Sequence, residues 1–208
     1  MAQNYRHTLF SEPVKALQER HGSRAAYLKM DAGADGTPDA LTAKELDYIA
    51  LRDSFYIASV NADGWPYMQH RGGPAGFLRH LDGNRIAFAD YRGNRQYIST
   101  ANLAGNDRVS LFLMDYPNKD RLKLVGHAHS VELAADPALV TSLMPEGYRA
   151  APERAFLIDV IGWEWNCSQH ITPRFTEAEI AAAIKPMAAE LNQLRAELAA
   201  LRAPASGE

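Results

Sequence analysis

Two polar clusters near the middle of the chain have the residue types of a site for a phosphate group. Residues 69–73 read Gln-His-Arg-Gly-Gly, which joins a fixed cation and an imidazole to glycines that let a ligand approach the backbone. Residues 90–96 read Asp-Tyr-Arg-Gly-Asn-Arg-Gln, between an expected strand and an expected helix, where free amides and the helix dipole favour a phosphate. Either cluster, taken alone, could also consist of arginines that are simply solvated at the protein surface and bind no ligand. Together the clusters predict one phosphorylated ligand.

The other potentially reactive side chains do not define a metal site or a catalytic site. His127 and His129 alternate along an expected strand and face one side, as metal ligands could, yet no cysteine or carboxylate at a suitable spacing completes a site, so we expect no metal. Cys167 is the single cysteine, which excludes an intramolecular disulfide and leaves a thiol nucleophile or an inert buried residue. The sequence holds no glycine-rich nucleotide fingerprint or Walker loop, and no catalytic acid or base can be assigned.

Short segments of alternating apolar and polar residues predict the strands that must position these clusters. They cover residues 54–60, 65–71, 76–81, 85–89, 109–114, 122–131 and 155–165. The turn-forming segment 61–64, Asn-Ala-Asp-Gly, predicts a hairpin between the first two. We expect five or six antiparallel strands in a small barrel, because closure removes most exposed strand edges.

Helices are predicted on both sides of the strands. A hydroxyl at Ser11, a proline at Pro13 and a stop at Gly22 predict one helix, and a Thr42/Glu45 capping box predicts another that ends near Arg52. Residues 31–40 are rich in glycine and aspartate and predict a loop or lid. Further helices are expected over residues 94–103 and from residue 136.

The clearest periodic pattern lies at the carboxyl end. A capping box of Thr176 and Glu179 precedes seven apolar residues spaced alternately by four and three, which is a heptad pattern: Ile180, Ile184, Met187, Leu191, Leu194, Leu198 and Leu201. Such a helix either associates with another chain or docks onto its own domain. Pro186 removes a backbone donor, so we expect a kink or a break near Lys185.

Composition limits the class of protein. The chain has 208 residues, a net charge of −3, 47% hydrophobic residues and a pI of about 6.2, which suit one folded domain with extensions and argue against a nucleic-acid binder. No apolar run is long enough to span a membrane, and residues 1–10 lack the features of a signal peptide, so we expect a cytoplasmic protein without a membrane contact. We expect a helical extension with a loop over 1–53, a barrel domain over 54–175 and a terminal helix over 176–208.

Residues 55–131, read in order, resemble the pyridoxamine 5'-phosphate oxidase-like, FMN-binding split-barrel superfamily. Residues 88–96, Phe-Ala-Asp-Tyr-Arg-Gly-Asn-Arg-Gln, are similar to its strand, phosphate turn and helix, and residues 108–112 and 121–126 are similar to the next two strands. The resemblance implies a mainly β fold with flanking helices, a six-stranded antiparallel split β-barrel. It also implies a homodimer with FMN at the subunit interface.

The resemblance assigns roles to individual residues. Arg71 would meet the flavin phosphate with Asn94 and Arg95. His70 and Gly72 would flank Arg71. The full set of implied cofactor-binding residues is His70, Arg71, Gly72, Ala89, Asp90, Asn94, Arg95, Gln96, Arg121, Gln169 and His170.

Three of these residues lie away from the phosphate turn. Arg121 takes the position from which the family reaches the flavin ring, usually through a glutamine. Gln169 and His170 follow the last strand, where the family places residues against the flavin of the partner subunit. The Arg-x-His pair with which the phosphate oxidases grip their substrate is missing from residues 163–171, so we expect a related flavoprotein rather than the phosphate oxidase itself.

The leading hypothesis is an FMN-dependent oxidoreductase that transfers hydride or electrons to or from a small organic substrate. The alternative is a non-catalytic flavin- or haem-binding or sensing protein on the same barrel, in which His127, His129 or His170 could supply an axial ligand. A third possibility is an interaction protein whose main feature is the terminal helix. The substrate, electron donor and acceptor are not specified by the sequence.

Overall fold

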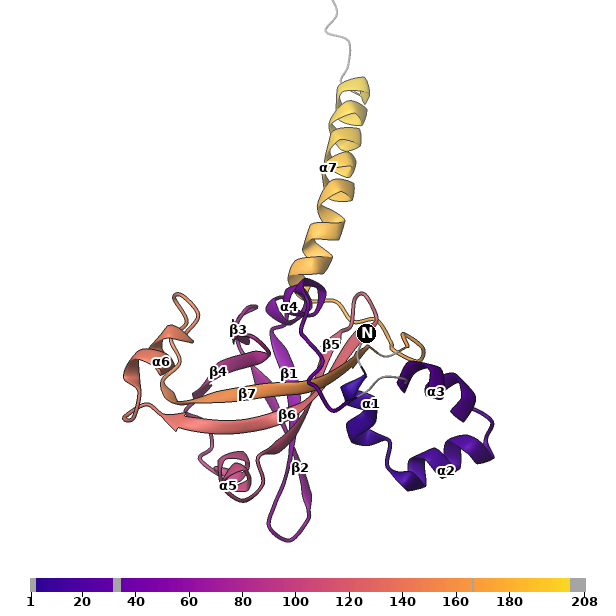
Figure 1. Cartoon of the computed structure of the whole chain (residues 1–208). Coiled ribbons are helices and arrows are strands. Elements are labelled where there is room, and N and C mark those ends of the chain that lie inside the picture. The colour runs from indigo at the N-terminus through magenta and orange to yellow at the C-terminus, as the bar shows by residue number, and fades with distance from the viewer. Residues whose placement is uncertain (1–2, 32–34, 166, 203–208) are drawn as a thin grey trace, which may run out of the picture. The chain divides into compact units, whose positions relative to one another are not determined.

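Seven antiparallel strands form a single sheet in the computed structural model, which describes residues 3–31, 35–165 and 167–202 (Figure 1). Their order across the sheet is β2-β1-β5-β6-β7-β4-β3. The strands are β1 (Ser54–Val60), β2 (Pro66–Gly72), β3 (Arg79–Asp82), β4 (Arg85–Tyr91), β5 (Arg108–Asp115), β6 (Asp120–Glu132) and β7 (Pro152–Trp165). The predicted split-barrel class is confirmed, whereas the predicted count of six strands is wrong by one, because all seven segments with a strand pattern form strands, the short β3 among them as an edge beside β4.

The helices occupy most of the predicted places. They are α1 (Asn4–Leu9), α2 (Glu12–Arg20), α3 (Arg24–Asp31), α4 (Ala43–Ala50), α5 (Ile98–Gly105), α6 (Pro137–Ser142) and α7 (Glu177–Arg202). The sequence pattern did not predict α1 or α3, which are short and weakly amphipathic. The predicted loop of residues 31–40 lies partly outside the described residues.

The β1–β2 hairpin forms where the sequence predicts it. Asn61 Oδ1 accepts hydrogen bonds from the backbone amides of Asp63 (3.0 Å) and Trp65 (2.8 Å), which fixes the turn. Gly64 has φ +85°, a conformation that suits glycine. The hairpin register pairs Phe55 with Arg71 and Ile57 with Gln69, so these polar β2 side chains share a face with buried β1 residues.

Strands β6 and β7 are long enough to belong to both halves of the barrel. The first half of β6 pairs with β5, and β7 pairs with both β6 and β4. The β6–β7 register shifts between Val125 and Gly126, and a bulge of this kind bends a strand. A Cβ at Gly126 would collide with the backbone carbonyl of Asp159, so the bend depends on glycine.

The barrel interior holds the main core. Four phenylalanines pack in series: Phe55 and Phe77 are stacked at 5.7 Å between centroids, and Phe88 and Phe156 at 5.2 Å. Phe156, Ile158 and Val160 face this core from β7, as the alternation predicts. Their burial supplies much of the driving force for folding.

A second core lies on the opposite face of β4 and β7, where α6 covers the sheet (Figure 1). Ala87 and Ala89 of β4 pack there with Val140 and Leu143. Small residues on β4 let α6 approach closely. Because both faces of β4 are covered, its sequence is a nearly continuous apolar run that ends at Asp90.

The chain divides into two units, the first formed by residues 1–115 and 120–169 and the second by 116–119 and 170–208. In the second unit, Arg174 lies over the Tyr116 ring at 4.7 Å. The predicted capping box is confirmed, since Glu179 Oε2 accepts from the Thr176 amide (2.7 Å) and Thr176 Oγ1 accepts from the Glu179 amide (3.2 Å). Helix α7 runs through Pro186 without a break, so that part of the expectation is wrong.

Residues 3–31, 35–165 and 167–202 include no helix with the length and apolar composition needed to cross a membrane.

Candidate functional site

A cavity of about 250 Å³ brings together both of the predicted polar clusters. It lies where β2 and β4 meet the loop of residues 92–97 and the start of α5. Its walls consist of Tyr67, Gln69, Arg71, Asp90, Tyr91, Gly93, Asn94, Arg95, Gln96, Tyr97, Ile98, Ser99, Thr100, Glu153 and Arg154. Arg71, Asp90, Asn94, Arg95 and Gln96 were all predicted site residues, and the fold places them on one cavity.

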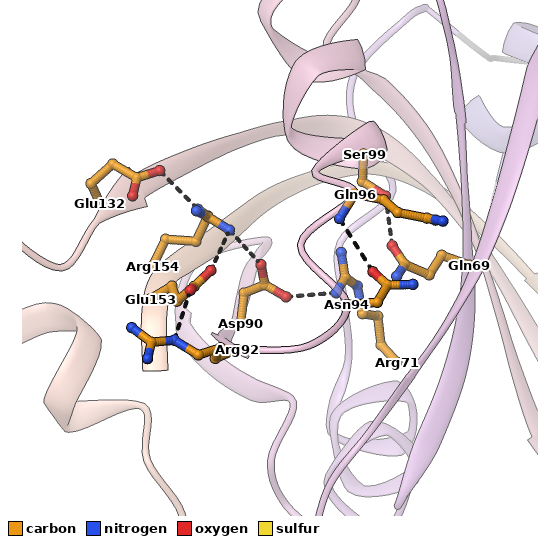
Figure 2. A network of polar contacts seen from close by, with 10 residues as sticks. All are labelled: Gln69, Arg71, Asp90, Arg92, Asn94, Gln96, Ser99, Glu132, Glu153 and Arg154. Carbon is orange, nitrogen blue, oxygen red and sulfur yellow. Dashed lines mark hydrogen bonds and ion pairs between the residues drawn. The ribbon is translucent and has the colours of Figure 1, made fainter. Parts of the chain in front are cut away.

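A network of ion pairs forms one wall of this cavity (Figure 2). Asp90 lies between two arginines: Arg71 Nη1 donates to its Oδ1 (2.6 Å) and Arg154 Nη1 to its Oδ2 (3.0 Å). Arg154 also binds Glu132 Oε1 through Nε (2.8 Å) and lies 3.6 Å from Glu153 Oε2. Arg92 extends the network at the surface by binding Glu153 (3.2 Å). The network fixes the orientation of both guanidiniums.

Burial affects the protonation of the central groups. It raises the pKa of the Asp90 carboxyl, and the guanidiniums of Arg71 and Arg154 oppose that rise. Burial also lowers the pKa of Arg71, while Asp90 opposes this change. The pKa of Arg154 is raised, because its hydrogen bonds to Glu132 and Asp90 outweigh its desolvation. An anion that enters the cavity therefore meets cations already removed from water, where charge interactions are strong.

The loop between β4 and α5 has an unusual backbone. Arg95 (φ 60°) and Tyr97 (φ 52°) adopt the left-handed conformation, which is costly for residues with a side chain. Because of these two residues, α5 begins at Ile98 rather than at the predicted residue 94. Tyr97 is the N-cap, and its side chain makes no capping hydrogen bond. The amide groups of the first turn are therefore available to a ligand in the cavity.

Helix α5 is held over the sheet by two polar contacts. Ser99 Oγ donates to Gln69 Oε1 (3.0 Å), and Asn102 Nδ2 donates to Ser59 Oγ (2.9 Å) in a buried position. Figure 2 shows the Ser99–Gln69 contact beside the cavity wall. These contacts fix the helix start against β2, so the amides and Arg71 face one space.

The donor groups of the cavity fit a phosphate. Arg71 Nε is buried and has no hydrogen-bond partner among the residues that the structure describes, although buried polar groups are normally paired. Arg95 is exposed and forms no ion pair with any residue that the structure describes. Three arginines and two carboxylates line the cavity, which gives it a net charge of about +1 when all are ionised.

A second cavity of about 210 Å³ adjoins the first and shares Arg71, Asp90, Tyr91 and Gly93 with it. The predicted residues His70, Gly72 and Ala89 line this second cavity rather than the first. Phe77 and Phe88 form its apolar part. The Arg71–Asp90 pair is thus part of the walls of both cavities.

Three predicted site residues are not among the residues that line either cavity. Arg121 is half-buried at the start of β6 opposite Met114, and its buried Nε has no hydrogen-bond partner within the described part of the chain. Gln169 is exposed after β7, and His170, also exposed, belongs to the second unit. The predicted contacts of these residues with a flavin stay predictions.

The other reactive residues of the sequence are at the surface. His127 is exposed and lies 3.0 Å from Asp107, His129 is exposed, and Cys167 is exposed. Within the described parts of the chain, no cluster of three or more His, Cys, Asp or Glu side chains could hold a metal ion.

Sequence reasoning missed several cavity residues, of which Arg154 is the most important. Its partner Asp90 is 64 positions away, and the β4–β7 register sets them opposite each other. The sequence offered one signal for Arg154, namely a charged residue directly before the apolar run that starts at Ala155. Ser99 was equally unspecific as a single polar residue, whereas Gln69 belongs to the first predicted polar cluster but was not among the predicted cofactor-binding residues.

Comparison with known proteins agrees with this geometry. The family model of pyridoxamine 5'-phosphate oxidase matches residues 41–165, which is more than half of the chain. HupZ of Group A Streptococcus has a similar structure, with 16% identity, a TM-score of 0.50 and coverage of 65% of this chain and 99% of its own. No curated protein matches the chain.

Two further solved structures are more distant. One is an FMN-binding protein from Syntrophomonas wolfei subsp. wolfei, with 9% identity, a TM-score of 0.45 and coverage of 72% of this chain and 97% of its own. The other is HutZ, a haem storage protein from Vibrio cholerae, with 14% identity, a TM-score of 0.38 and coverage of 57% and 89%. The family match, on a split barrel whose polar cavity lies at the predicted phosphate turn, shows that the chain belongs to the pyridoxamine 5'-phosphate oxidase family.

Proposed function

We propose that the chain binds FMN, with the flavin phosphate at the start of α5. One observation carries this proposal: the first turn of α5, which its N-cap Tyr97 does not cap, lines the same cavity as Arg71, whose buried Nε has no hydrogen-bond partner among the described residues. A phosphate there would accept from helix amides and from a guanidinium at once. Arg95 would add a second cation from the loop. Membership in the family supports a flavin as the carrier of that phosphate.

The protein would act as an FMN-dependent oxidoreductase on a small organic substrate. Bound flavin supplies hydride and electron transfer, and the protein supplies binding and orientation. Asn94 and Gln96 add polar groups to the phosphate end of the cavity. The adjoining cavity, with His70 and the Phe77 and Phe88 rings, offers mixed polar and apolar walls for the rest of the cofactor.

We further propose a homodimer in which the outer face of β1 and β2 contacts a second copy. Tyr56 (37% exposed) and Met68 (66% exposed) lie on this face, and the β2 edge of the sheet is unpaired. Exposed apolar residues beside a free strand edge are typical of an association surface. Light scattering of the purified chain should give twice the mass of one chain, and Met68→Asp should shift it toward the monomer.

The phosphate assignment is tested by comparing FMN with riboflavin, which lacks the phosphate. The parent protein should bind FMN more tightly than riboflavin. Arg95→Ala should weaken FMN binding about tenfold or more, since hydrogen bonds to a charged group contribute about 1.5–3 kcal/mol. It should leave riboflavin binding unchanged. Arg108→Ala is the matched control, because Arg108 is exposed on β5 and lies outside both cavities.

If Arg95→Ala lost the same affinity for FMN and for riboflavin, the substitution would act on folding and not on phosphate binding. Unchanged FMN affinity in Arg95→Ala, together with equal parent affinities for FMN and riboflavin, would overturn the proposal. An absorption spectrum of the purified protein separates the cofactor classes. Flavin bands support FMN, whereas a Soret band would favour the non-catalytic haem-binding alternative.

A further inference from the structure

Helix α7, drawn in yellow in Figure 1, carries a heptad pattern of apolar residues from Ile180 to Leu201. In the usual heptad letters, the d positions hold Ile180, Met187, Leu194 and Leu201, and the a positions hold Ile184, Leu191 and Leu198. These side chains are between 46% and 84% exposed, and the helix buries none of its residues. Apolar seams of this kind are covered in stable helices.

The charges beside the seam are arranged in a specific order. The g positions of the last two complete heptads are Glu190 and Glu197, and the following e positions are Arg195 and Arg202. Glu190, Arg195 and Arg202 form no ion pair with any residue that the structure describes, and Glu197 accepts from Gln193 (2.9 Å). Each glutamate thus precedes an arginine by five positions.

From this order we propose that α7 forms a parallel, in-register, two-stranded coiled coil with α7 of a second copy of the chain. In a parallel pair, each g residue faces the e residue five positions later on the partner helix. Glu190 then meets the second copy's Arg195, and Glu197 meets its Arg202, in both directions. An antiparallel pair would instead set g against g and e against e, which places like charges together. Charge complementarity therefore selects a second copy and one orientation.

Pro186 is compatible with this pairing because of its position in the heptad. It occupies a c position, and the carbonyl that it leaves without a donor belongs to Ala182 at f. Both positions lie on the face away from the seam. The missing hydrogen bond is therefore exposed to water rather than to the partner helix, and the apolar contacts at Ile184 and Met187 can continue past it.

Cysteine cross-linking in the full chain tests orientation and register. In a Cys167→Ser background, Leu194→Cys introduces a thiol at a d position, where a parallel in-register pair brings the two copies of one residue together. Mild oxidation should convert most of this variant to a disulfide-linked dimer on a non-reducing gel. Ala189→Cys, at an f position on the outer face, is the matched control and should cross-link at least tenfold more slowly.

Charge reversal provides a second test on the same background. Glu190→Arg with Glu197→Arg should slow cross-linking of Leu194→Cys several-fold at low salt, because arginine then faces arginine. Adding Arg195→Glu and Arg202→Glu should restore it, since every pair is again of opposite sign. The reversal effect should shrink in 1 M NaCl, where the Debye length is about 3 Å.

Two outcomes would overturn the proposal. One is equal cross-linking at positions 194 and 189, which would indicate random collision. The other is the absence of cross-linking at position 194, both with the original charges and with all four charges exchanged. This result would indicate another orientation or another occupant of the seam. FMN affinity of these variants reports separately on the barrel, so failure of the coiled coil and failure of the proposed cofactor are distinguishable.

Discussion

Arg71 and Asp90 form an ion pair of 2.6 Å that joins the end of β2 to the end of β4, with side chains only 15% and 7% exposed. Both residues contribute to the walls of both cavities. Asp90 therefore holds Arg71 in place and also competes with any phosphate for it. This dual role predicts that affinity and stability respond in opposite directions when the carboxylate is removed.

Asp90→Asn should tighten FMN binding by about fivefold to tenfold, since one negative charge leaves the phosphate end of the cavity. The same change leaves two buried guanidiniums with fewer acceptors, so the free energy of unfolding should fall by about 1–3 kcal/mol. Fluorescence titration with FMN and urea unfolding of the same preparation measure the two effects. Weaker binding of FMN would contradict this prediction and would show that the positioning of Arg71 by Asp90 outweighs the competition.

Arg154 should be as important to the site as the residues predicted from sequence. Arg154→Met removes the ion pairs to Asp90 and Glu132 and the contact with the Tyr97 ring, 5.0 Å away. The free energy of unfolding should fall by about 2–4 kcal/mol, because Asp90 loses a buried partner. Arg154→Lys should recover part of this loss.

The exposed arginine of the same network provides the control. Arg92 is paired only with Glu153 among described residues and its side chain is 59% exposed, so Arg92→Met should change stability by less than about 0.5 kcal/mol. Thermal or urea unfolding of Arg154→Met, Arg154→Lys and Arg92→Met measures these changes in stability. Similar losses at positions 92 and 154 would contradict the network described here.

Much of the fold follows from local sequence pattern, whereas the site depends on pairings between distant segments. Alternation identified the strands around Phe55, Ile57 and Phe156, because these residues fill the barrel core. The expected start of α5 was too early, since the left-handed backbone at Arg95 and Tyr97 has no signature in residue type. The Asp90–Arg154 contact needs the β4–β7 register, which no local window contains.

The same distinction explains the errors in the helical parts. Helix α1 is short, and its position depends on Asp39, more than 30 residues later in the chain. The break predicted near Pro186 is wrong because strong helix formers on both sides outweigh one lost hydrogen bond. For α1 a contact with a distant residue decides the structure, whereas for α7 the helix propensity of the neighbouring residues outweighs the effect of the proline.

Asp39 should hold the amino-terminal segment on the barrel. Its Oδ1 accepts from the amides of Gln3 (2.6 Å) and Asn4 (2.9 Å), and its Oδ2 accepts from that of Tyr5 (2.9 Å). Asp39→Ala should release α1 and lower the free energy of unfolding by about 1–3 kcal/mol, because several buried amides lose their acceptor. Limited proteolysis should then cut within residues 3–31 much faster. Asp47→Ala, at an exposed position with no described hydrogen bond, is the control and should be cut like the parent.

Glu45 should make the stability of the protein depend on pH. Its carboxylate is buried, which raises the pKa, but hydrogen bonds from Thr42 and from Trp165 Nε1 (2.8 Å) outweigh burial and leave the pKa lowered. A carboxyl whose folded pKa lies below its unfolded value of about 4.3 stabilises the fold above that value and loses this contribution as pH falls through the folded pKa. Glu45→Gln cannot ionise, so it lacks the contribution at every pH.

Urea unfolding should therefore show Glu45→Gln to be less stable than the parent by about 1–2 kcal/mol at pH 7, with a difference that shrinks as the pH falls below about 4. Trp165 fluorescence offers a local readout, because its indole donates to this carboxylate. Glu146→Gln removes an exposed carboxylate and should track the parent across the same range. A Glu45→Gln deficit that stays constant from pH 7 to pH 3.5 would assign the effect to packing and hydrogen-bond geometry rather than to the ionised carboxylate.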